Sequence, residues 1–322
     1  MPSYQISPYL QERYVLAGQS DVYDKCNELI SKFLRIEVNA MQVHRVTNTY
    51  GKLSADLINI ESVKPLKEVS KTDVVYAEMD GGMVLTRENG WQEIKVGRLF
   101  RQSDIHIMSP KRQEILDSVY KAHLGDHKIF CQQFEPLVDE FEPLQDRLVF
   151  ITDGAKWIKN WIKENYPKAT VILDYYHASE YIGKWCDWTF PDKVLRKDKV
   201  EQYRTVVLEK GIQTLLSHLE EDIKVMNKQT QTTENEQIKI LEYFKGNAYR
   251  MDYPQYIQRG LSIGSGAIEA SHRTIVQKRM KLSGQRWSED RVQNMLNLRT
   301  ASMSGQWEEV VNIIRNQNKM AA

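Results

Sequence analysis

The sequence has few cysteines, no long apolar run and no excess of charge of either sign. Its 322 residues include only Cys26, Cys131 and Cys186, which lie far apart and form no CxxC pair. This spacing argues against a disulfide framework or a zinc site and is typical of a reducing cytoplasm. Because 44 Lys and Arg stand against 43 Asp and Glu, any nucleic-acid surface must come from local clustering rather than from the total charge.

Membrane and export signals are also absent. No stretch approaches the ~18 consecutive apolar residues that a membrane span needs. The first residues, MPSYQISPYLQER, lack the basic and apolar regions of a signal peptide. We therefore expect a soluble cytoplasmic protein with no membrane partner, large enough for one large domain or two to three smaller ones.

Residues 1–70 are predicted to be a small helical region. Helices are predicted over 20–34 and 40–53, from apolar residues at helical spacing. Two short helices joined by a tight turn can form a DNA-binding helix-turn-helix. The exposed face of its second helix would carry Gln42, Arg45 and Asn48, with His44 beside them. A helix pair that only packs is the alternative interpretation.

The pattern changes to strands in residues 71–189. Three strands are predicted up to Phe100, the first ending at Asp80, with a hairpin turn at Asn89-Gly90. Residues 110–145 are predicted to be mainly helical. A strand, a helix and a fifth strand follow, and this order predicts an α/β fold with a mixed sheet.

The remaining chain is predicted to be helical. Residues 190–260 contain no convincing strand and form a predicted helical insertion, which includes the polar loop NKQTQTTENEQ. Residues 261–322 are predicted to hold a helix beginning near Gly266 and two C-terminal helices, at about 288–303 and 306–317.

Two apolar strands are each followed by an aspartate and a glycine. VVYAEMDGG contains Asp80, and RLVFITDGAKWI contains Asp153. Ligands of open α/β sheets bind outside the carboxyl ends of strands, and glycine lets a ligand approach the backbone. If the two strands are neighbours, the two carboxylates can share Mg²⁺, which prefers oxygen ligands. Alternatively, each aspartate is only a turn former or a helix N-cap.

A third acid, Glu269, is predicted in the first turn of a helix, where the helix dipole favours an anion. No acid follows before Glu289, but five basic residues do. Beside a carboxylate metal site, such a run suits a phosphate backbone, although a solvated helix face is the alternative. The basic residues are Arg273, Lys278, Arg279, Lys281 and Arg286.

Other nucleotide and hydrolase sites are disfavoured because their motifs are missing. Asp153 is preceded by no GxxxxGK[ST] loop, which a P-loop enzyme needs. GSGAIEA has Glu269 where a dinucleotide fingerprint has its third glycine, and no GxSxG nucleophile elbow occurs.

Five segments occur in a defined order and spacing: EMDGG, EIKVGRLFR, ITDGAKWI, LDYYHASEYI and IGSGAIEASHRTIVQKRMKLSGQRWS. They resemble bacterial insertion-sequence DDE transposases of the ISKra type. The resemblance extends from about residue 5 to residue 312, and its last motif is long and specific. It implies a ribonuclease-H-like core that is interrupted by the helical insertion before the last acid. It also implies a catalytic and metal-binding triad of Asp80, Asp153 and Glu269.

The resemblance further implies strand cleavage at the ends of an element and strand transfer into target DNA. Two Mg²⁺ ions about 3.5–4 Å apart, or Mn²⁺ as a substitute, would activate the nucleophile and stabilise the leaving oxygen. Asp80 would bridge the ions, while Asp153 and Glu269 would each hold one. The expected partners are double-stranded DNA and further copies of the chain, as a homodimer or higher multimer, associated with the nucleoid.

His177, in DYYH, lies where related transposases often carry a histidine near the scissile phosphate, and we predict that it contacts DNA. A packing or surface histidine is the alternative. Relatives commonly have more sequence before SPYLQER, so part of the region that binds element ends is expected to be absent. Two other functions stay open: an inactive or truncated DNA-binding remnant, and a ribonuclease-H-like structure-specific nuclease such as a junction resolvase.

Overall fold

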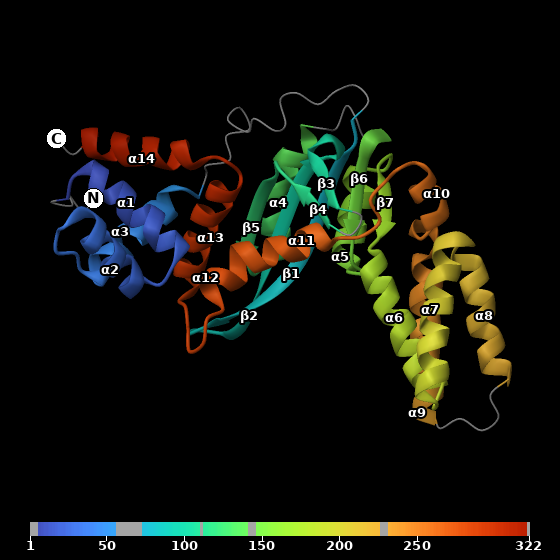
Figure 1. Cartoon of the computed structure of the whole chain (residues 1–322). Helices are drawn as coiled ribbons and strands as arrows, with labels where there is room; N and C mark the ends of the chain where they lie inside the picture. Colours follow the sequence, from blue (N-terminus) through green and yellow to red (C-terminus); the bar gives the residue numbers. More distant parts are fainter. Residues whose placement is uncertain (1–5, 56–72, 110–111, 141–145, 226–230, 321–322) are drawn as a thin grey trace. The chain divides into compact units, whose positions relative to one another are not determined.

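The computed structural model describes residues 6–55, 73–109, 112–140, 146–225 and 231–320 (Figure 1). The chain divides into two compact units. The first unit comprises residues 1–148 and 267–322, and the second comprises residues 149–266. The boundary predicted between residues 70 and 71, and residues 227–230 of the predicted polar loop, lie outside the described ranges. The fold is mixed α/β, as the sequence predicts, with antiparallel and parallel strand pairs.

The N-terminal helices of the first unit share one hydrophobic core with the C-terminal helices. They are α1 (Pro8–Ser20), α2 (Tyr23–Leu34), α3 (Ala40–Leu53), α13 (Glu289–Met303) and α14 (Trp307–Met320). The prediction for α3 is confirmed at both ends. Helix α2 begins later than predicted because Ser20 ends α1, a helix that was not predicted although Ser7 caps it and Pro8 opens it. None of the described helices is long and apolar enough to cross a membrane.

The surface of α3 fits either interpretation of the helix pair. Gln42 and Arg45 are exposed, as predicted, and Asn48 is half-buried. The Asn48 amide donates a hydrogen bond to the His44 carbonyl at 2.8 Å, and the His44 ring packs edge-on against Tyr23. Burial lowers the pKa of the half-buried His44, which favours its neutral form.

A long antiparallel hairpin forms the centre of the first unit. Strands β1 (Val75–Thr86) and β2 (Gly90–Arg101) meet at the predicted Asn89-Gly90 turn, where Gly90 has a φ of 68°. The prediction that a strand ends at Asp80 is wrong. β1 continues through Asp80 and the two glycines after it, because each of these residues is paired with β2; Asp80 lies opposite Val96.

The predicted helix over residues 110–145 is wrong in its first half. The chain forms β3 (Ile105–Ser109), β4 (Arg112–Ile115) and β5 (Val119–Leu124), and α4 (His127–Asp139) begins only afterwards. β5 pairs with the free edge of β2, which places β2 between β1 and β5. β5 is a strand because it pairs with β2, and its local sequence does not predict this.

The segment that carries Glu269 covers one face of this hairpin. It consists of α11 (Gly266–His272), a π-helical turn η6 (Arg273–Gln277) and α12 (Lys278–Met280). Its apolar residues Ile268, Ile275, Val276 and Met280 are buried against strand residues that include Val84 and Ile94. Each such buried side chain contributes about 1.5–3 kcal/mol, so the segment is held mainly by its apolar face.

The second unit begins with the predicted strand, helix and strand. β6 (Leu148–Thr152), α5 (Lys156–Asn165) and β7 (Thr170–Leu173) are confirmed, and the two strands pair in parallel. The helices that follow are α6 (Tyr175–Thr189), α7 (Lys193–Glu209), α8 (Ile212–Val225), α9 (Gln231–Asn247) and α10 (Tyr253–Gln258). Figure 1 shows α6 to α9 running as long helices beside one another.

The helical part of the second unit is not separate from its strands. The fully buried Arg250 donates a hydrogen bond to the Thr152 hydroxyl at 3.0 Å, at the end of β6. The Tyr253 hydroxyl donates to the Leu173 carbonyl at 2.9 Å, at the end of β7. The last third of the predicted insertion therefore completes the packing of the strand ends.

A buried arginine on α13 donates hydrogen bonds to backbone carbonyls, two of which lie in the π-helical turn. The Arg299 guanidinium, on α13, donates to the carbonyl oxygen of Ile275 at 2.6 Å and to those of Thr274 and Gln19. Burial lowers the pKa of Arg299, so the charge is held in place against a desolvation cost. This cost is offset by the hydrogen bonds that the guanidinium donates to these three carbonyls.

We predict that Arg299→Met lowers the free energy of unfolding by about 3 kcal/mol or more, because buried carbonyls are left without their donor. Arg315→Met, on the exposed surface of α14, should change it by less than about 0.5 kcal/mol. Urea denaturation followed by circular dichroism measures both values. Equal effects of the two substitutions would contradict an anchoring role for Arg299.

Candidate functional site

Asp80 and the helix that carries Glu269 lie together in the first unit. The half-buried Asp80 has its Oδ2 atom 3.5 Å from Nε2 of His272, on α11. Glu269 is exposed and lies three residues before His272, so the two residues share one side of the helix. Figure 1 shows α11 alongside β1. The fold therefore places the first predicted acid on a strand that contacts the helix carrying the third, within one unit.

Gly82 makes this close approach of helix and strand sterically feasible. A Cβ atom at Gly82 would lie 2.7 Å from Nδ1 and 2.8 Å from Cε1 of His272, closer than packed atoms come. The glycine is therefore needed for helix packing, whereas the sequence pattern had indicated room for a ligand. Gly82, two residues beyond Asp80 in the DGG sequence, thus leaves room for the His272 ring.

Arg98, on β2, fixes the start of α11. Its Nη1 atom donates to the Ala267 carbonyl at 2.7 Å and to the Ser271 hydroxyl at 3.3 Å. The Arg98 side chain is buried, and it also packs over the rings of Phe100 and Tyr120. Arg98 was not among the predicted site residues, although a single arginine inside the apolar run VGRLF was a signal that it has a buried partner.

Asp153 occupies the predicted place at the end of β6. Its Oδ1 atom accepts a hydrogen bond from the Ala155 amide at 2.9 Å, which shapes the turn into α5. The residue is half-buried, whereas all five residues of β6 before it are buried. Asp153 belongs to the second unit, so its convergence with Asp80 and Glu269 stays a prediction.

His177 follows β7, as predicted, and its ring lies near a buried carboxylate. The side chain of His177 is 33% exposed, and its Nδ1 atom lies 3.9 Å from Oδ2 of Asp174, which is fully buried. The other oxygen of Asp174 accepts from the amides of Tyr176 and Ser265, at 3.1 and 2.9 Å. Asp174 thus caps α6 and faces the imidazole, a role that was not predicted.

Four of the five predicted basic contacts are on the surface, namely Arg273, Lys278, Lys281 and Arg286. The prediction that Arg279 contacts DNA is not supported, because its side chain is 1% exposed. Its Nε atom donates to the Gly18 carbonyl at 3.1 Å, and its guanidinium lies over the rings of Tyr23 and Trp287. Burial lowers the pKa of Arg279, and the residue joins α12 to the N-terminal helices.

The described ranges contain no group of three or more His, Cys, Asp or Glu that is arranged to hold a metal ion. The donor types nevertheless fit a divalent cation. Asp80 presents a carboxylate oxygen beside the imidazole of His272, and carboxylates such as Asp153 and Glu269 are the ligands that Mg²⁺ and Mn²⁺ prefer. A three-carboxylate site of the predicted kind therefore requires Asp153 to join the pair on the first unit.

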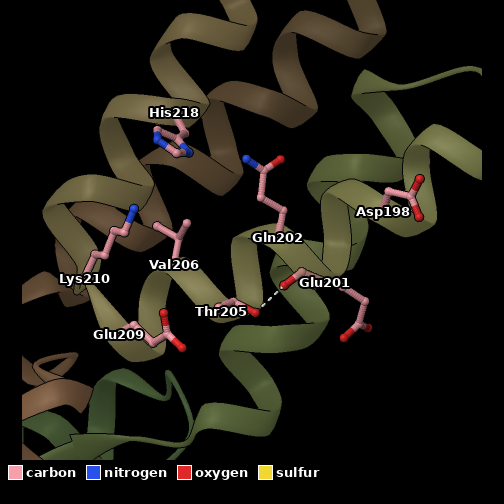
Figure 2. A pocket seen from close by; sticks show the side chains of 8 residues that line it. All are labelled: Asp198, Glu201, Gln202, Thr205, Val206, Glu209, Lys210 and His218. Atoms are coloured by element: carbon pink, nitrogen blue, oxygen red, sulfur yellow. Dashed lines mark hydrogen bonds between the residues drawn. The ribbon is translucent and has the colours of Figure 1, made fainter.

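A separate groove lies on α7 and α8 (Figure 2). Its volume is about 480 Å³, and the Thr205 hydroxyl donates to the Glu201 carbonyl within it at 2.9 Å. The lining residues are Asp198, Glu201, Gln202, Thr205, Val206, Glu209, Lys210 and His218. None of the predicted site residues lines this groove, which is mostly a charged helix surface, so we assign it no part in the site.

Comparison with known proteins places the chain in a family. The model of a family described as "Uncharacterised protein family (UPF0236)" matches residues 6–317. The chain belongs to this family. It is similar to a protein of Streptococcus gallolyticus named "UPF0236 protein in vanSb 3'region", with 25% identity over 274 residues. The matched part is 82% of this chain and 57% of the relative, so the chain spans little more than half of that relative's length.

We predict that Gly82→Ala lowers the free energy of unfolding by about 1–3 kcal/mol, because the new methyl group would displace the His272 ring. Gly183→Ala, on α6 with no atom within 4 Å of the new Cβ, should be neutral or stabilising by up to about 1 kcal/mol. Thermal denaturation compares the two. The destabilisation should shrink in a His272→Ala background; an undiminished effect would show that the imidazole is not the obstacle.

Proposed function

We propose that this protein is a DDE transposase with a ribonuclease-H-like core, which cleaves DNA at the ends of an element and joins those ends to target DNA. The observation that carries the proposal is the contact of Asp80 with α11, the helix on which Glu269 lies. Asp80 and Glu269 are far apart in the sequence, and the fold places them on a strand and a helix that are packed together. Two of the three acids that the resemblance implies are thus supported by the packing of a single unit.

The environment of Asp153 supports its role as the second acid. It comes after a buried strand of a parallel pair, at the carboxyl end where ligands of α/β sheets bind. One carboxylate oxygen is used by the turn into α5, and the residue keeps contact with solvent. A carboxylate held by a backbone amide is fixed in direction, which suits a metal ligand.

The remaining residues would bind and orient the DNA. A divalent cation held by Asp80, Asp153 and Glu269 would supply Lewis-acid stabilisation of the phosphodiester oxygens. The exposed basic side chains begin directly after α11, so they would contact phosphates next to the scissile one. His177 would contact a phosphate through Nε2, because Asp174 lies on the side of Nδ1. Two bound ends require at least two copies of the chain.

We predict that Asp80→Asn, Asp153→Asn and Glu269→Gln each reduce cleavage at least about 1,000-fold. Affinity for DNA should change by less than about threefold, because neutral isosteres keep the fold and remove no positive charge. The substrate is a duplex that contains the DNA flanking the coding sequence, with cleavage and joining followed on gels. Asp198→Asn, in the groove on α7, is the control that should stay active.

The same assay separates the alternatives. Unimpaired cleavage by any of the three variants would refute the triad, and an equal loss of DNA affinity would indicate a folding role. Cleavage without joining by the wild-type protein would favour a structure-specific nuclease. DNA binding without cleavage would favour a DNA-binding remnant.

The surface prediction is tested by the salt dependence of DNA binding. Replacing Lys278 and Lys281 together by Gln should flatten the slope of log K against log salt concentration by about 0.9 for each phosphate that is no longer neutralised. The same change at Arg315 and Lys319, which are exposed on α14, should leave the slope unchanged. Fluorescence anisotropy at several salt concentrations measures both. Equal slopes for the first pair and the wild type would show that this stretch is only a solvated face.

A further inference from the structure

The imidazole of His272 is buried with a nitrogen that has no hydrogen-bond partner. The residue is 6% exposed, and its Nε2 atom is without a partner although Oδ2 of Asp80 lies 3.5 Å away. A buried polar atom without a hydrogen bond is destabilising, because its interactions with water are not replaced. Such a cost is explained when the atom is a ligand for something that binds there.

The separation of the two atoms matches that of two ligands on one cation. Ligand atoms that each lie about 2.1 Å from a metal ion are about 3.0 Å apart in octahedral geometry and about 3.4 Å apart in tetrahedral geometry. The Nε2 and Oδ2 atoms are 3.5 Å apart, so small side-chain movements would bring both onto one ion. A nitrogen–oxygen pair at this distance without a hydrogen bond has the spacing of a ligand pair.

The position of Glu269 extends this pair. Glu269 and His272 form a Glu-x-x-His sequence on α11, and residues three apart lie on the same face of a helix. Helical carboxylate metal proteins use this spacing to direct a carboxylate and an imidazole at one site. The described residues contain no preformed group of three ligands, so Glu269 would have to turn toward Asp80 when a cation binds; its side chain is exposed and not part of the core.

We propose that His272 is a metal ligand together with Asp80, and that Glu269 completes a carboxylate–imidazole site on the first unit. This inference rests on the proposed function, because Asp80 and Glu269 are also two acids of the triad. It changes the expected metal, since an imidazole ligand shifts preference from Mg²⁺ toward transition ions such as Mn²⁺. Gly82 and Arg98 then serve the site by holding the helix close enough to β1.

The test is pulsed electron paramagnetic resonance of the full chain with Mn²⁺ as the probe. The wild-type protein should bind Mn²⁺ and show ¹⁴N coupling from a histidine. His272→Gln should lose this coupling and bind Mn²⁺ at least about tenfold more weakly. Asp80→Asn should weaken binding to a similar extent while leaving residue 272 in place. His106→Gln, exposed on β3, should behave as the wild type.

The outcomes separate this inference from the proposed function. Mn²⁺ binding that depends on Asp80 but shows no ¹⁴N coupling in the wild type would overturn the role of His272 and leave the carboxylate triad standing. Coupling that persists in His272→Gln and disappears in His177→Gln would assign the ligand to His177 instead. Absence of Mn²⁺ binding to the wild-type protein would refute this site and the metal dependence of the proposed function together. Circular dichroism of each variant confirms that weaker binding is not due to unfolding.

Discussion

The attachment of α11 and the π-helical turn to the β1–β2 hairpin is the constraint on which the first unit depends. Apolar residues supply most of the stabilisation, but they do not fix the register of the helix along the strands. Buried arginines give the direction. Arg98, on β2, holds the first turn against the strands through Ala267 and Ser271. Arg299 ties the π-helical turn to α13, and Arg279 ties the end of the segment to α1. Because a guanidinium has five donors in a fixed plane, each arginine fixes direction as well as distance.

This arrangement explains why chemistry-bearing residues sit on a short helix. A seven-residue helix has little stability of its own and would not hold two ligands in place. Here Arg98 fixes its beginning, and Gly82 lets His272 contact the strand. The position of Asp80 inside a fully paired strand adds to this rigidity, since a residue within a ladder moves less than one at a strand end. Site residues on such elements are held more firmly than residues on loops.

The parts of the fold that could be predicted from the sequence are those with a local signal. Asn89-Gly90 is a hairpin-turn sequence by itself. The helical spacing of apolar residues in α3 and its N-cap, Asn39, are also local signals. β5 could not be predicted, because it exists through pairing with β2. The continuation of β1 beyond Asp80 was missed for the same reason. Glycines weaken a strand, but here Gly81, Gly82 and the residues on either side of them are all paired with β2.

The residues of the candidate site also differ in whether a local sequence signal marks them. Asp80, Asp153 and Glu269 stand out because each is an acid at the border of an apolar pattern, a signal that is local. His272 and Arg98 acquire their roles from contacts between distant segments, so a local pattern can mark them as unusual but cannot name their partners. Arg279 was misassigned because the π-helical turn before it adds a residue to the turn and changes which side chains face the core.

The basic stretch contains side chains in two different environments. Arg279 points inward and ties the segment to the N-terminal helices, whereas Lys278 and Lys281 on either side point to solvent. An anion bound by these lysines would act on a segment that buried arginines connect rigidly to α11. A shift of that segment would also displace His272, because a close-packed core transmits small displacements. If the proposed contact with a phosphate backbone is made, it would therefore be mechanically coupled to the geometry around Asp80.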